Sequence, residues 1–416
     1  MAFNDSKFEV VVINDFAHIN GGAAKVAIES ACGLAESGVP VSFFSAVKPV
    51  EERLFRAGVH VVCLDEAEIA SEKNRFKAFI QGIWNRNAAV KIAELLSHKS
   101  PSNTIVHVHG WTKALSSSVV KAPISMGFQV VVTLHDYFSV CPNGGLFEYP
   151  AQKVCMKRPL SLDCIICNCD VRHYSHKLWR VARQWVQKYF GRLPDGIEHF
   201  IYLTDFSLEK MQCYLPGKAT YYRVSNPIDL GTWRRDSLPD TPRFVFAGRL
   251  SAEKGIHIFA QAVSELGMDG VIVGDGPLRS ELQEKYPKLR FTGWLSPEEV
   301  YQQMTKSSAL VFPSQCYETQ GLVVQEAAAL GVPSVVSDEC AAIDFVEDGV
   351  NGIHFKSGDP DSLAKVLNEL ASNGCLVQRL GQNALEKSSM KSPDLVSHIE
   401  SLMAVYDQVS RQRRAA

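Results

Sequence analysis

The chain has 416 residues, 46% of them hydrophobic and 21% charged, which is typical of a globular protein with two or three domains. Its net charge of −2 excludes a molecule that binds polyanions over its whole surface. The charge is uneven, because residues 1–228 hold 25 Lys and Arg against 20 Asp and Glu, so this half is the one expected to approach an anionic surface.

The sequence lacks a run of the roughly 18 apolar residues that a membrane span needs, and its first apolar run, Val10–Ile13, is too short for a secretory signal. We therefore expect a cytoplasmic protein. In that reducing environment the eleven cysteines are expected to be free thiols or metal ligands rather than disulfides.

Short β-branched runs alternate with helix-length segments, the first of which is Ala23–Ser37. The strands predicted in the first half are Val10–Ile13, Val41–Phe44, Val59–Leu64, Thr104–His109 and Val130–Leu134. Those predicted in the second half are Arg243–Ala247, Gly270–Val273, Leu289–Thr292, Ala309–Phe312 and Ser334–Val336. This alternation predicts an α/β fold in which parallel sheets carry helices on both faces.

A turn-forming segment, Ser225–Asp229, separates the two α/β halves, because Pro227 disfavours helix at the residue before it. The sequence therefore predicts domains at 1–228 and 229–392, with a ligand-binding cleft between them. Residues 393–416 carry apolar side chains at helical spacing from Leu395 to Val409, which predicts an amphipathic helix that must pack against another part of the chain.

The strongest motif is a pair of glutamates, Glu318 and Glu326, separated by seven residues after a predicted strand. If the whole segment were helical, the pair would span roughly 12 Å. The two carboxylates of glycoside hydrolases lie only roughly 5–9.5 Å apart, so this pair suits the two ends of an extended ligand better. Gly321 would let the backbone approach a phosphate at the helix N-terminus. The alternative is two solvated glutamates on an ordinary helix.

A second motif, Phe246-Ala-Gly-Arg-Leu-Ser-Ala-Glu-Lys-Gly255, lies between a strand and a helix. Arg249 and Lys254 in such a turn can converge on a diphosphate, which needs positive charge as it leaves. Two glycine turns after strands, at Gly21-Gly22 and at Gly274, are weaker signals, and the first is no complete dinucleotide-binding fingerprint. Taken alone, the second motif could also be a helix cap with surface cations.

Taken together, the motifs form a recognisable order along the chain. The Gly-Gly loop, His135-Asp136, Gly248-Arg-Leu with Glu-Lys-Gly, Gly274-Asp-Gly-Pro and Glu-x7-Glu follow one another. The sequence thereby resembles the retaining glycosyltransferases of family 4, most specifically between Phe246 and Asn351. This resemblance implies the GT-B fold, which has two facing Rossmann-like domains, an interdomain cleft and a C-terminal helix that crosses back to the N-terminal domain.

The resemblance also implies roles for individual residues. It places the acceptor on the domain of residues 1–228 and a UDP- or GDP-sugar donor on residues 229–392, without a catalytic metal. It assigns catalytic roles to His135, Arg249, Lys254 and Glu318. It places the donor against Gly21, Gly22, Gly248, Gly274, Trp294, Gln320, Gly321, Leu322 and Glu326. In this scheme Arg249 and Lys254 hold the diphosphate, Glu318 the sugar and Glu326 the ribose.

The predicted function is transfer of a sugar, with retention of its anomeric configuration, to a glycan or lipid-linked acceptor in the synthesis of a surface polysaccharide such as O-antigen, capsule or exopolysaccharide. One alternative is a soluble transferase that acts on a small metabolite. Another is an inactive protein that binds nucleotide sugars or nucleic acid, although no nucleic-acid motif accompanies the basic residues.

Five cysteines gather in the Gly- and Pro-containing insertion at residues 141–170. Four thiolates can hold zinc tetrahedrally, so we predict structural zinc on Cys141, Cys155, Cys164 and Cys167, with Cys169 as an alternative ligand. Unliganded thiols and an iron–sulfur cluster are the other interpretations.

Two segments, 73–91 and 171–192, interleave basic and aromatic residues. Such helices can lie at an anionic bilayer, so we predict peripheral contact with the inner face of a membrane. The alternative is a helix that packs on the core and turns a solvated basic face outward.

Overall fold

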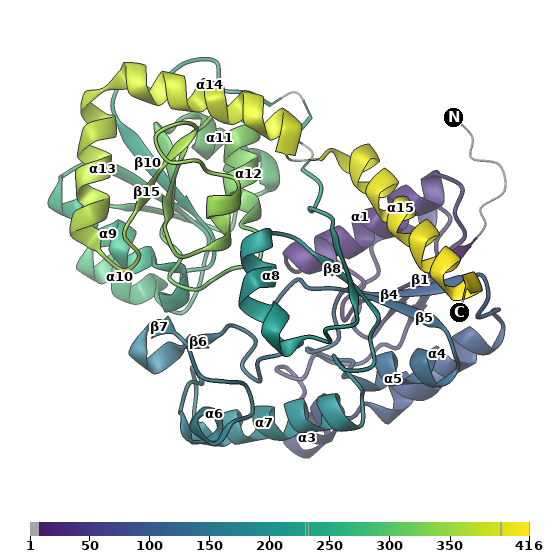
Figure 1. The fold of residues 1–416 in the computed structure, drawn as a ribbon. Helices are drawn as coiled ribbons and strands as arrows, with labels where there is room; N and C mark the ends of the chain where they lie inside the picture. Colours follow the sequence, from purple (N-terminus) through teal and green to yellow (C-terminus); the bar gives the residue numbers. More distant parts are fainter. Residues whose placement is uncertain (1–7, 229, 232, 392, 416) are drawn as a thin grey trace.

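The computed structural model describes residues 8–228, 230–231, 233–391 and 393–415, and it contains two parallel sheets (Figure 1). Their strand orders are β3-β2-β1-β4-β5-β8-β9 and β12-β11-β10-β13-β14-β15. In each sheet the first strand along the chain lies beside the fourth, as in dinucleotide-binding folds. The prediction of two Rossmann-like α/β domains is therefore confirmed.

The first sheet contains seven strands, which are β1 (Glu9–Ile13), β2 (Val41–Ser45), β3 (His60–Cys63), β4 (Thr104–Val108), β5 (Gln129–Thr133), β8 (His199–Tyr202) and β9 (Thr220–Arg223). Its helices are α1 (Gly22–Glu36), α2 (Glu52–Arg56), α3 (Arg75–Ile83), α4 (Arg86–Ser97), α5 (Ser118–Ser125), α6 (Leu162–Ile166), α7 (Tyr174–Tyr189) and α8 (Asp205–Met211). A short antiparallel hairpin, β6 (Phe147–Glu148) and β7 (Lys153–Val154), lies within the cysteine-containing insertion.

The second sheet contains β10 (Arg243–Ala247), β11 (Asp269–Val273), β12 (Arg290–Gly293), β13 (Ala309–Phe312), β14 (Ser334–Ser337) and β15 (Gly352–Phe355). Around it lie α9 (Ile256–Glu265), α10 (Arg279–Lys285), α11 (Pro297–Thr305), α12 (Leu322–Ala329), α13 (Pro360–Ser372) and α14 (Gly374–Lys391). The predicted domain boundary at residue 228 falls in the connection between β9 and β10.

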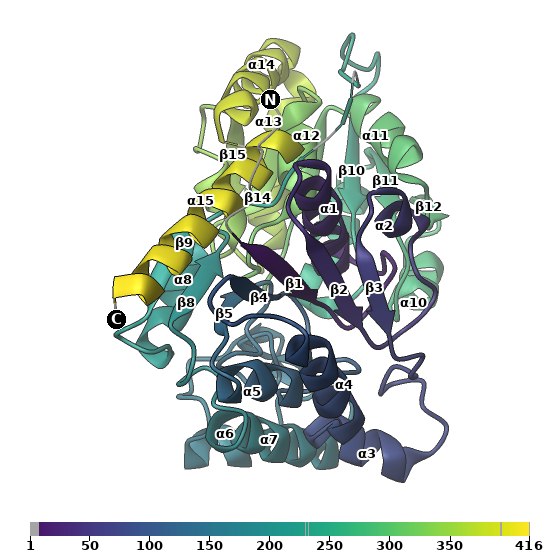
Figure 2. The ribbon, with the colours of Figure 1, turned by 90° about the vertical axis from the view of Figure 1, so that its right-hand side faces the viewer.

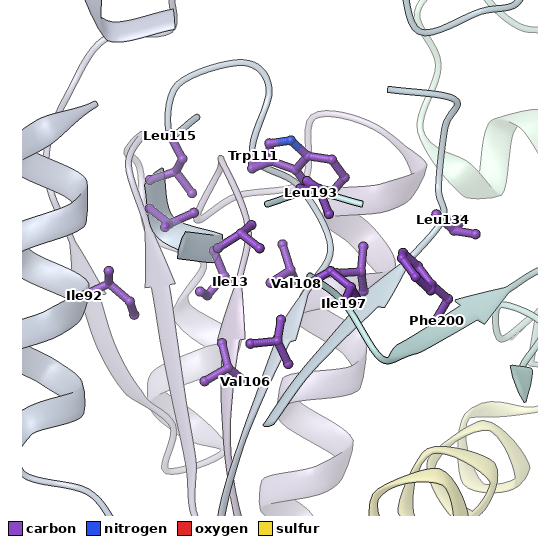
Figure 3. Packing of buried hydrophobic residues seen from close by; sticks show 14 of the residues in the cluster. Ile13, Ile92, Val106, Val108, Trp111, Leu115, Leu134, Leu193, Ile197 and Phe200 are labelled. Carbon is purple, nitrogen blue, oxygen red and sulfur yellow. The ribbon is translucent and has the colours of Figure 1, made fainter. Parts of the chain in front are cut away.

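The central strands are buried on both faces, which explains their continuous apolar sequences. One face of the first sheet packs on α4 and α5, where Ile13, Ile92 and Val106 belong to one apolar cluster (Figure 3). All ten strands predicted from the sequence are present. In the two parallel sheets β8, β9 and β15 were not predicted, because their sequences mix aromatic and polar residues and contain no long aliphatic run. The short hairpin of β6 and β7 was not predicted either.

The C-terminal helix α15 (Leu395–Ala415) returns to the first domain and lies along α1 (Figure 2). The two helices approach closely at Gly33, where a Cβ would lie 2.7 Å from Cγ1 of Ile399. Tyr406 is fully buried, and its hydroxyl lies 2.7 Å from Nδ1 of His107 on β4. The predicted crossover is therefore confirmed, and it attaches the last helix to the centre of the first sheet.

Within the described ranges, none of the helices has the length and apolar character needed to cross a membrane.

Candidate active site

The predicted site residues lie directly after central strands of both sheets. Gly21-Gly22 follow β1 and His135 follows β5, whereas Gly248 and Glu318 follow β10 and β13 in the second domain. The carboxyl ends of parallel strands form one edge of a sheet, and ligands bind at that edge where the strand order reverses. The topology therefore gathers these separate segments at the two facing edges.

The N-termini of two helices from different domains meet at this place. Helix α1 begins at Gly22 and α12 begins at Leu322, and neither helix has a side-chain cap. A Cβ on Gly22 would lie 3.2 Å from Cδ1 of Leu322, so the two ends are in contact distance. Uncapped N–H groups and the helix dipoles favour a negatively charged group here.

Lys254 and Glu318 form an ion pair beside these helix ends. Nζ of Lys254 donates to Oε1 of Glu318 at 2.5 Å, and the hydroxyl of Ser314 donates to the same oxygen at 2.7 Å. Burial alone would lower the pKa of Lys254, but the charge of Glu318 and this hydrogen bond raise it above its usual value. Burial opposes ionisation of Glu318 as well, yet Lys254 and Ser314 hold its pKa below the usual value. Both side chains are therefore charged at neutral pH.

Glu318 is not helical, which changes the geometry of the glutamate pair. Its φ is 52°, in the left-handed region, and the helix begins only at Leu322. One helix therefore does not carry both carboxylates, so neither the span of roughly 12 Å for a fully helical segment nor the alternative of two glutamates on an ordinary helix applies.

Glu326 does lie on α12, and its pKa is raised above the usual value, mainly by burial. Two charged residues of α1 also act on it, since Lys25 lowers this pKa and Glu29 raises it. The second glutamate thus faces the first domain.

Hydrogen bonds between the domains fix the loop that carries Glu318. The hydroxyl of Tyr137 donates to the carbonyl of Glu318 at 2.5 Å, and that of Thr204 donates to the carbonyl of Thr319 at 2.9 Å. In return, the Thr319 hydroxyl donates to the carbonyl of His135 at 2.8 Å. These three bonds hold the backbone of His135 against the Glu318 loop across the domain boundary.

Gln320 adds a polar group to the same loop. It is only 2% exposed, and its Oε1 accepts from the backbone N–H of Asn226 at 3.4 Å. Its buried Nε2 has no hydrogen-bond partner among the described residues. A buried unpaired donor is costly, so this amide can serve a ligand.

His135 is half-buried and lies next to the buried His109. Its Nε2 is 2.9 Å from Nδ1 of His109, and the two rings stack with centroids 5.1 Å apart. Burial lowers the pKa of His135 to about 3, and it also lowers the pKa of His109 well below the usual value. Both imidazoles are therefore neutral at physiological pH, and His135 can donate or accept a hydrogen bond without carrying charge.

The glycine turns of the second domain lie side by side. Gly274 has a φ of 124°, and a Cβ there would lie 2.0 Å from the carbonyl oxygen of Gly248. Gly274 also donates its N–H to the carbonyl of Gly293 at 2.9 Å, next to Trp294, whose side chain is 80% exposed. Only glycine fits at residue 274, because the two turns approach backbone to backbone.

Arg249 is exposed, whereas Lys254 is engaged in the ion pair with Glu318. It lines a cavity together with Lys113, Phe138 and Arg183 of the first domain. Lys254 thus lies in an ion pair and Arg249 lines a cavity with residues of the other domain, and the convergence of the two cations on one diphosphate stays a prediction.

The cysteine-containing insertion brings all five thiols around one small cavity. Cys141, Cys155, Cys164, Cys167 and Cys169 line it together with Lys177. Lys177 is 1% exposed, and its Nζ lies 3.4 Å from Sγ of Cys164. Within the described part of the chain, however, no group of three or more His, Cys, Asp or Glu side chains is arranged to hold a metal ion. The zinc site has no support from this arrangement and stays a prediction.

The side chains of helix α7 are not oriented as expected for a helix with a basic outer surface. Lys177 and Arg183 are 1% and 8% exposed, whereas Trp185 and Tyr189 are 51% and 58% exposed. The helix therefore turns part of its basic face inward and its aromatic face outward. The expectation that the basic side chains form the outer surface is wrong for Lys177 and Arg183.

Some residues that shape the site belong to no sequence motif and were not predicted. His109 follows β4 in a Val-His-Gly sequence, and Tyr137 and Thr319 are neighbours of predicted residues. The position of His109 at the end of a central strand was the one available signal. Contacts between domains, such as that of Tyr137, leave no pattern in the sequence.

Comparisons with known proteins agree with this arrangement. Residues 241–373 match the family model of Glycosyl transferases group 1. The chain is similar to the α-D-kanosaminyltransferase of Streptomyces kanamyceticus, with 30% identity over 161 residues, which are 36% of this chain and 42% of that protein. It is also similar to a GDP-mannose-dependent α-mannosyltransferase of Corynebacterium glutamicum, with 39% identity over 108 residues and 26% coverage of each chain. The matched segments thus span less than half of these two relatives.

Among solved structures, the chain is similar to Anabaena Alr3699/HepE in complex with UDP and glucose. The TM-score is 0.67 at 15% identity, over 96% of this chain and 100% of that one. This likeness extends over both domains and shows that the fold is that of the GT-B glycosyltransferases.

Proposed function

We propose that the protein is a glycosyltransferase that takes a sugar from a nucleoside-diphosphate sugar bound at the edge of the second sheet. The carrying observation is the contact between the two helix N-termini at Gly22 and Leu322 beside the Lys254–Glu318 ion pair. Positive ends of helices and an ammonium group are what a leaving diphosphate needs, and they supply it without a metal. The match of residues 241–373 to the glycosyltransferase family model supports the same assignment.

The roles of the side chains follow from this binding mode. Lys254 and Arg249 hold the diphosphate, and Glu318 accepts hydrogen bonds from the sugar hydroxyls. Glu326 accepts from the ribose hydroxyls, and Trp294 lies near the base. Because each bond to a carboxylate contributes about 1.5–3 kcal/mol, the two glutamates together would account for much of the donor's orientation.

His135 would face the reacting sugar from the first domain, as a neutral hydrogen-bonding group. Its low pKa supports this role, because a charged imidazole there would repel positive charge that develops on the sugar. We further propose that the enzyme retains the anomeric configuration, as the family 4 resemblance implies. The anomeric configuration of the product, read from the proton coupling constant of its anomeric signal, tests this point.

We further propose that the product is a surface polysaccharide and the acceptor a lipid-linked glycan, and exposed apolar side chains on two helices of the first domain support this proposal. Helices α3 and α7 lie side by side at one end of the first domain (Figure 1). They expose large apolar side chains, namely Phe76, Phe79, Ile80, Leu178, Trp185, Tyr189 and Phe190. Exposed apolar side chains on neighbouring helices favour contact with another apolar phase. Sedimentation with anionic vesicles tests it, and loss of pelleting in Trp185→Ser is the expected result.

The donor is tested by thermal shift and by donor hydrolysis with UDP-, GDP-, ADP- and CMP-sugars. A donor that binds only the folded protein raises the melting temperature by mass action. We expect a shift with UDP- or GDP-sugars that Lys254→Ala and Glu326→Ala abolish. Lys365→Ala, an exposed lysine on α13 of the same domain, is the matched control and should keep the shift. If no nucleotide sugar shifts the melting temperature or is hydrolysed, the proposal is wrong.

A further inference from the structure

A cavity of about 580 Å³ lies in the first domain, between α3, α7 and the loop after β4, and reaches Arg249 of the second domain. Its lining carries six cationic side chains, which are Arg75, Lys113, Arg172, Arg180, Arg183 and Arg249. Glu68 is the one carboxylate among the lining residues. The cavity contains none of the donor-site residues Gly22, Lys254 or Glu318, so it is a separate space that meets the donor site at Arg249.

Part of this positive charge is balanced within the protein, because Asp136 and Asp15 interact with the charges of Lys113 and Arg183. Arg180 pairs with Asp170 at 3.0 Å, but among the described residues no carboxylate lies within 4.0 Å of the charged groups of Lys113, Arg172 or Arg249. Like charges that converge without partners repel one another, and an anion bound among them removes that cost. The cavity is therefore suited to a multiply charged anionic group.

The cavity includes a buried cation, Arg183, in addition to exposed basic side chains. It is 8% exposed, and its guanidinium lies over the rings of Phe138 and Trp179, at 4.9 Å and 5.2 Å from their centroids. It also donates to the carbonyl of Thr112 at 3.0 Å. Burial lowers its pKa to about 10, so it stays cationic at neutral pH. A fixed, buried cation at the base of the cavity provides a rigid anchor for an anion.

The cavity continues directly into the exposed apolar face of α3 and α7. Phe79 and Trp179 line it, and the indole N–H of Trp179 donates to the carbonyl of Phe79 at 3.3 Å, which joins the two helices. Next to them, Phe76 is 74% exposed and Leu178 is 43% exposed. A cationic hollow that opens onto an apolar surface matches a molecule with a charged head and a hydrocarbon chain.

We propose that this cavity binds the diphosphate of a lipid-linked acceptor, with the lipid chain lying along the face formed by α3 and α7. The inference rests on the proposed function, because Arg249 at the meeting point would face both the donor and the acceptor. Lys113 and Arg172 contact the diphosphate from the cavity rim, and Arg183 contacts it from below. The acceptor is thus selected by its charge and its lipid as well as by its sugar.

In the test, farnesyl diphosphate is titrated into the full-length protein and the binding is measured by calorimetry. The protein is first saturated with the nucleoside diphosphate that gives the largest thermal shift. The test variant is Lys113→Gln with Arg172→Gln, since both side chains are exposed and the fold does not depend on them. The control is Lys188→Gln, a cation on α7 outside the cavity. The double variant should bind farnesyl diphosphate about tenfold or more weakly, because it loses two charge-assisted contacts, whereas the control should bind it as the wild type does.

Three results would overturn the proposal. The first is equal affinity of the double variant and the wild type for farnesyl diphosphate. The second is equal affinity of the wild type for inorganic pyrophosphate and for farnesyl diphosphate, because the lipid chain then adds nothing. The nucleotide-induced thermal shift is measured on the same variants. The third result is a wild type that shows this shift but does not bind farnesyl diphosphate, in which case only the acceptor proposal is wrong. Absence of the shift in the wild type itself contradicts the proposed function.

Discussion

Replacement of Glu318 by Gln removes the negative charge of the Lys254–Glu318 pair but keeps the size and shape of the side chain. Glutamine can keep hydrogen bonds to Lys254 and Ser314, but the buried ammonium loses its counter-charge. The side chains of Lys254 and Glu318 are 29% and 15% exposed, so water screens the pair in part. We therefore expect a loss of about 2 kcal/mol in stability, within the range for hydrogen bonds to charged groups and below the 3–5 kcal/mol for a fully buried pair.

For a domain of this size, that loss corresponds to a fall of about 4–8 °C in the melting temperature. The assay is a thermal melt of both proteins between pH 4 and 9. The matched control is Glu52→Gln, which breaks an exposed pair with Arg56 at 2.6 Å and should lower the melting temperature by only about 1–2 °C, as surface helix pairs do.

The pH dependence provides an independent check of the same reasoning. The folded-state pKa of Glu318 lies below its usual 4.5, so its contribution is complete above pH 4.5 and is lost as the pH falls through the folded-state value. The pKa of Lys254 lies above its usual 10.5, so its contribution stays complete up to that pH. The difference between wild type and Glu318→Gln should therefore be constant from pH 5 to 9 and shrink below pH 4.5. Equal melting temperatures at pH 7 would refute the reasoning.

Three further predictions concern other parts of the molecule. Gly274→Ala should destabilise the protein by more than the roughly 1–3 kcal/mol of backbone strain alone, because the new Cβ would lie 2.0 Å from the Gly248 carbonyl oxygen. The control is Gly267→Ala, since Gly267 also has a positive φ but a Cβ there would meet no atom within 4 Å, and equal melting temperatures of the two variants would contradict the prediction. Metal analysis of purified protein should find about one equivalent of zinc, reduced in Cys164→Ser, and less than about half an equivalent would rule the site out. The NMR signals of the His135 ring should not titrate between pH 5 and 8, because burial lowers the pKa of His135 to about 3 in the folded protein. Since the usual pKa in the unfolded chain is near 6.5, the stability of the fold falls as the pH drops below 6.5, and a titration midpoint near 6.5 in the folded protein would disprove this prediction.

The fold was predicted from local sequence patterns. Val10–Ile13 and Thr104–His109 are apolar and β-branched because central parallel strands are buried on both faces, so their positions are visible without any tertiary information. The strand β9 escaped detection because Thr-Tyr-Tyr-Arg at a sheet edge is partly exposed and has no such run. Strands at the edges follow weaker compositional rules than strands at the centre.

The same limit appears at the site. The spacing of Glu318 and Glu326 is visible in the sequence, but only the structure shows that the chain passes through a left-handed conformation at Glu318 before the helix begins at Leu322. The inward orientation of Lys177 and Arg183 on α7 depends on what packs beside that helix, so composition could not distinguish it from a solvated basic face.

By itself, the sequence determined which segments become strands and helices, where glycine turns follow the strands, and which residue types gather there, because these depend on neighbours along the chain. The tertiary structure alone decided which turns meet. The contact of Gly22 with Leu322, the pairing of His135 with His109, and the cationic cavity between α3 and α7 join segments that lie far apart in sequence. Their physical cause is the packing of two sheets and their helices into one fold, and that packing has no periodic signature.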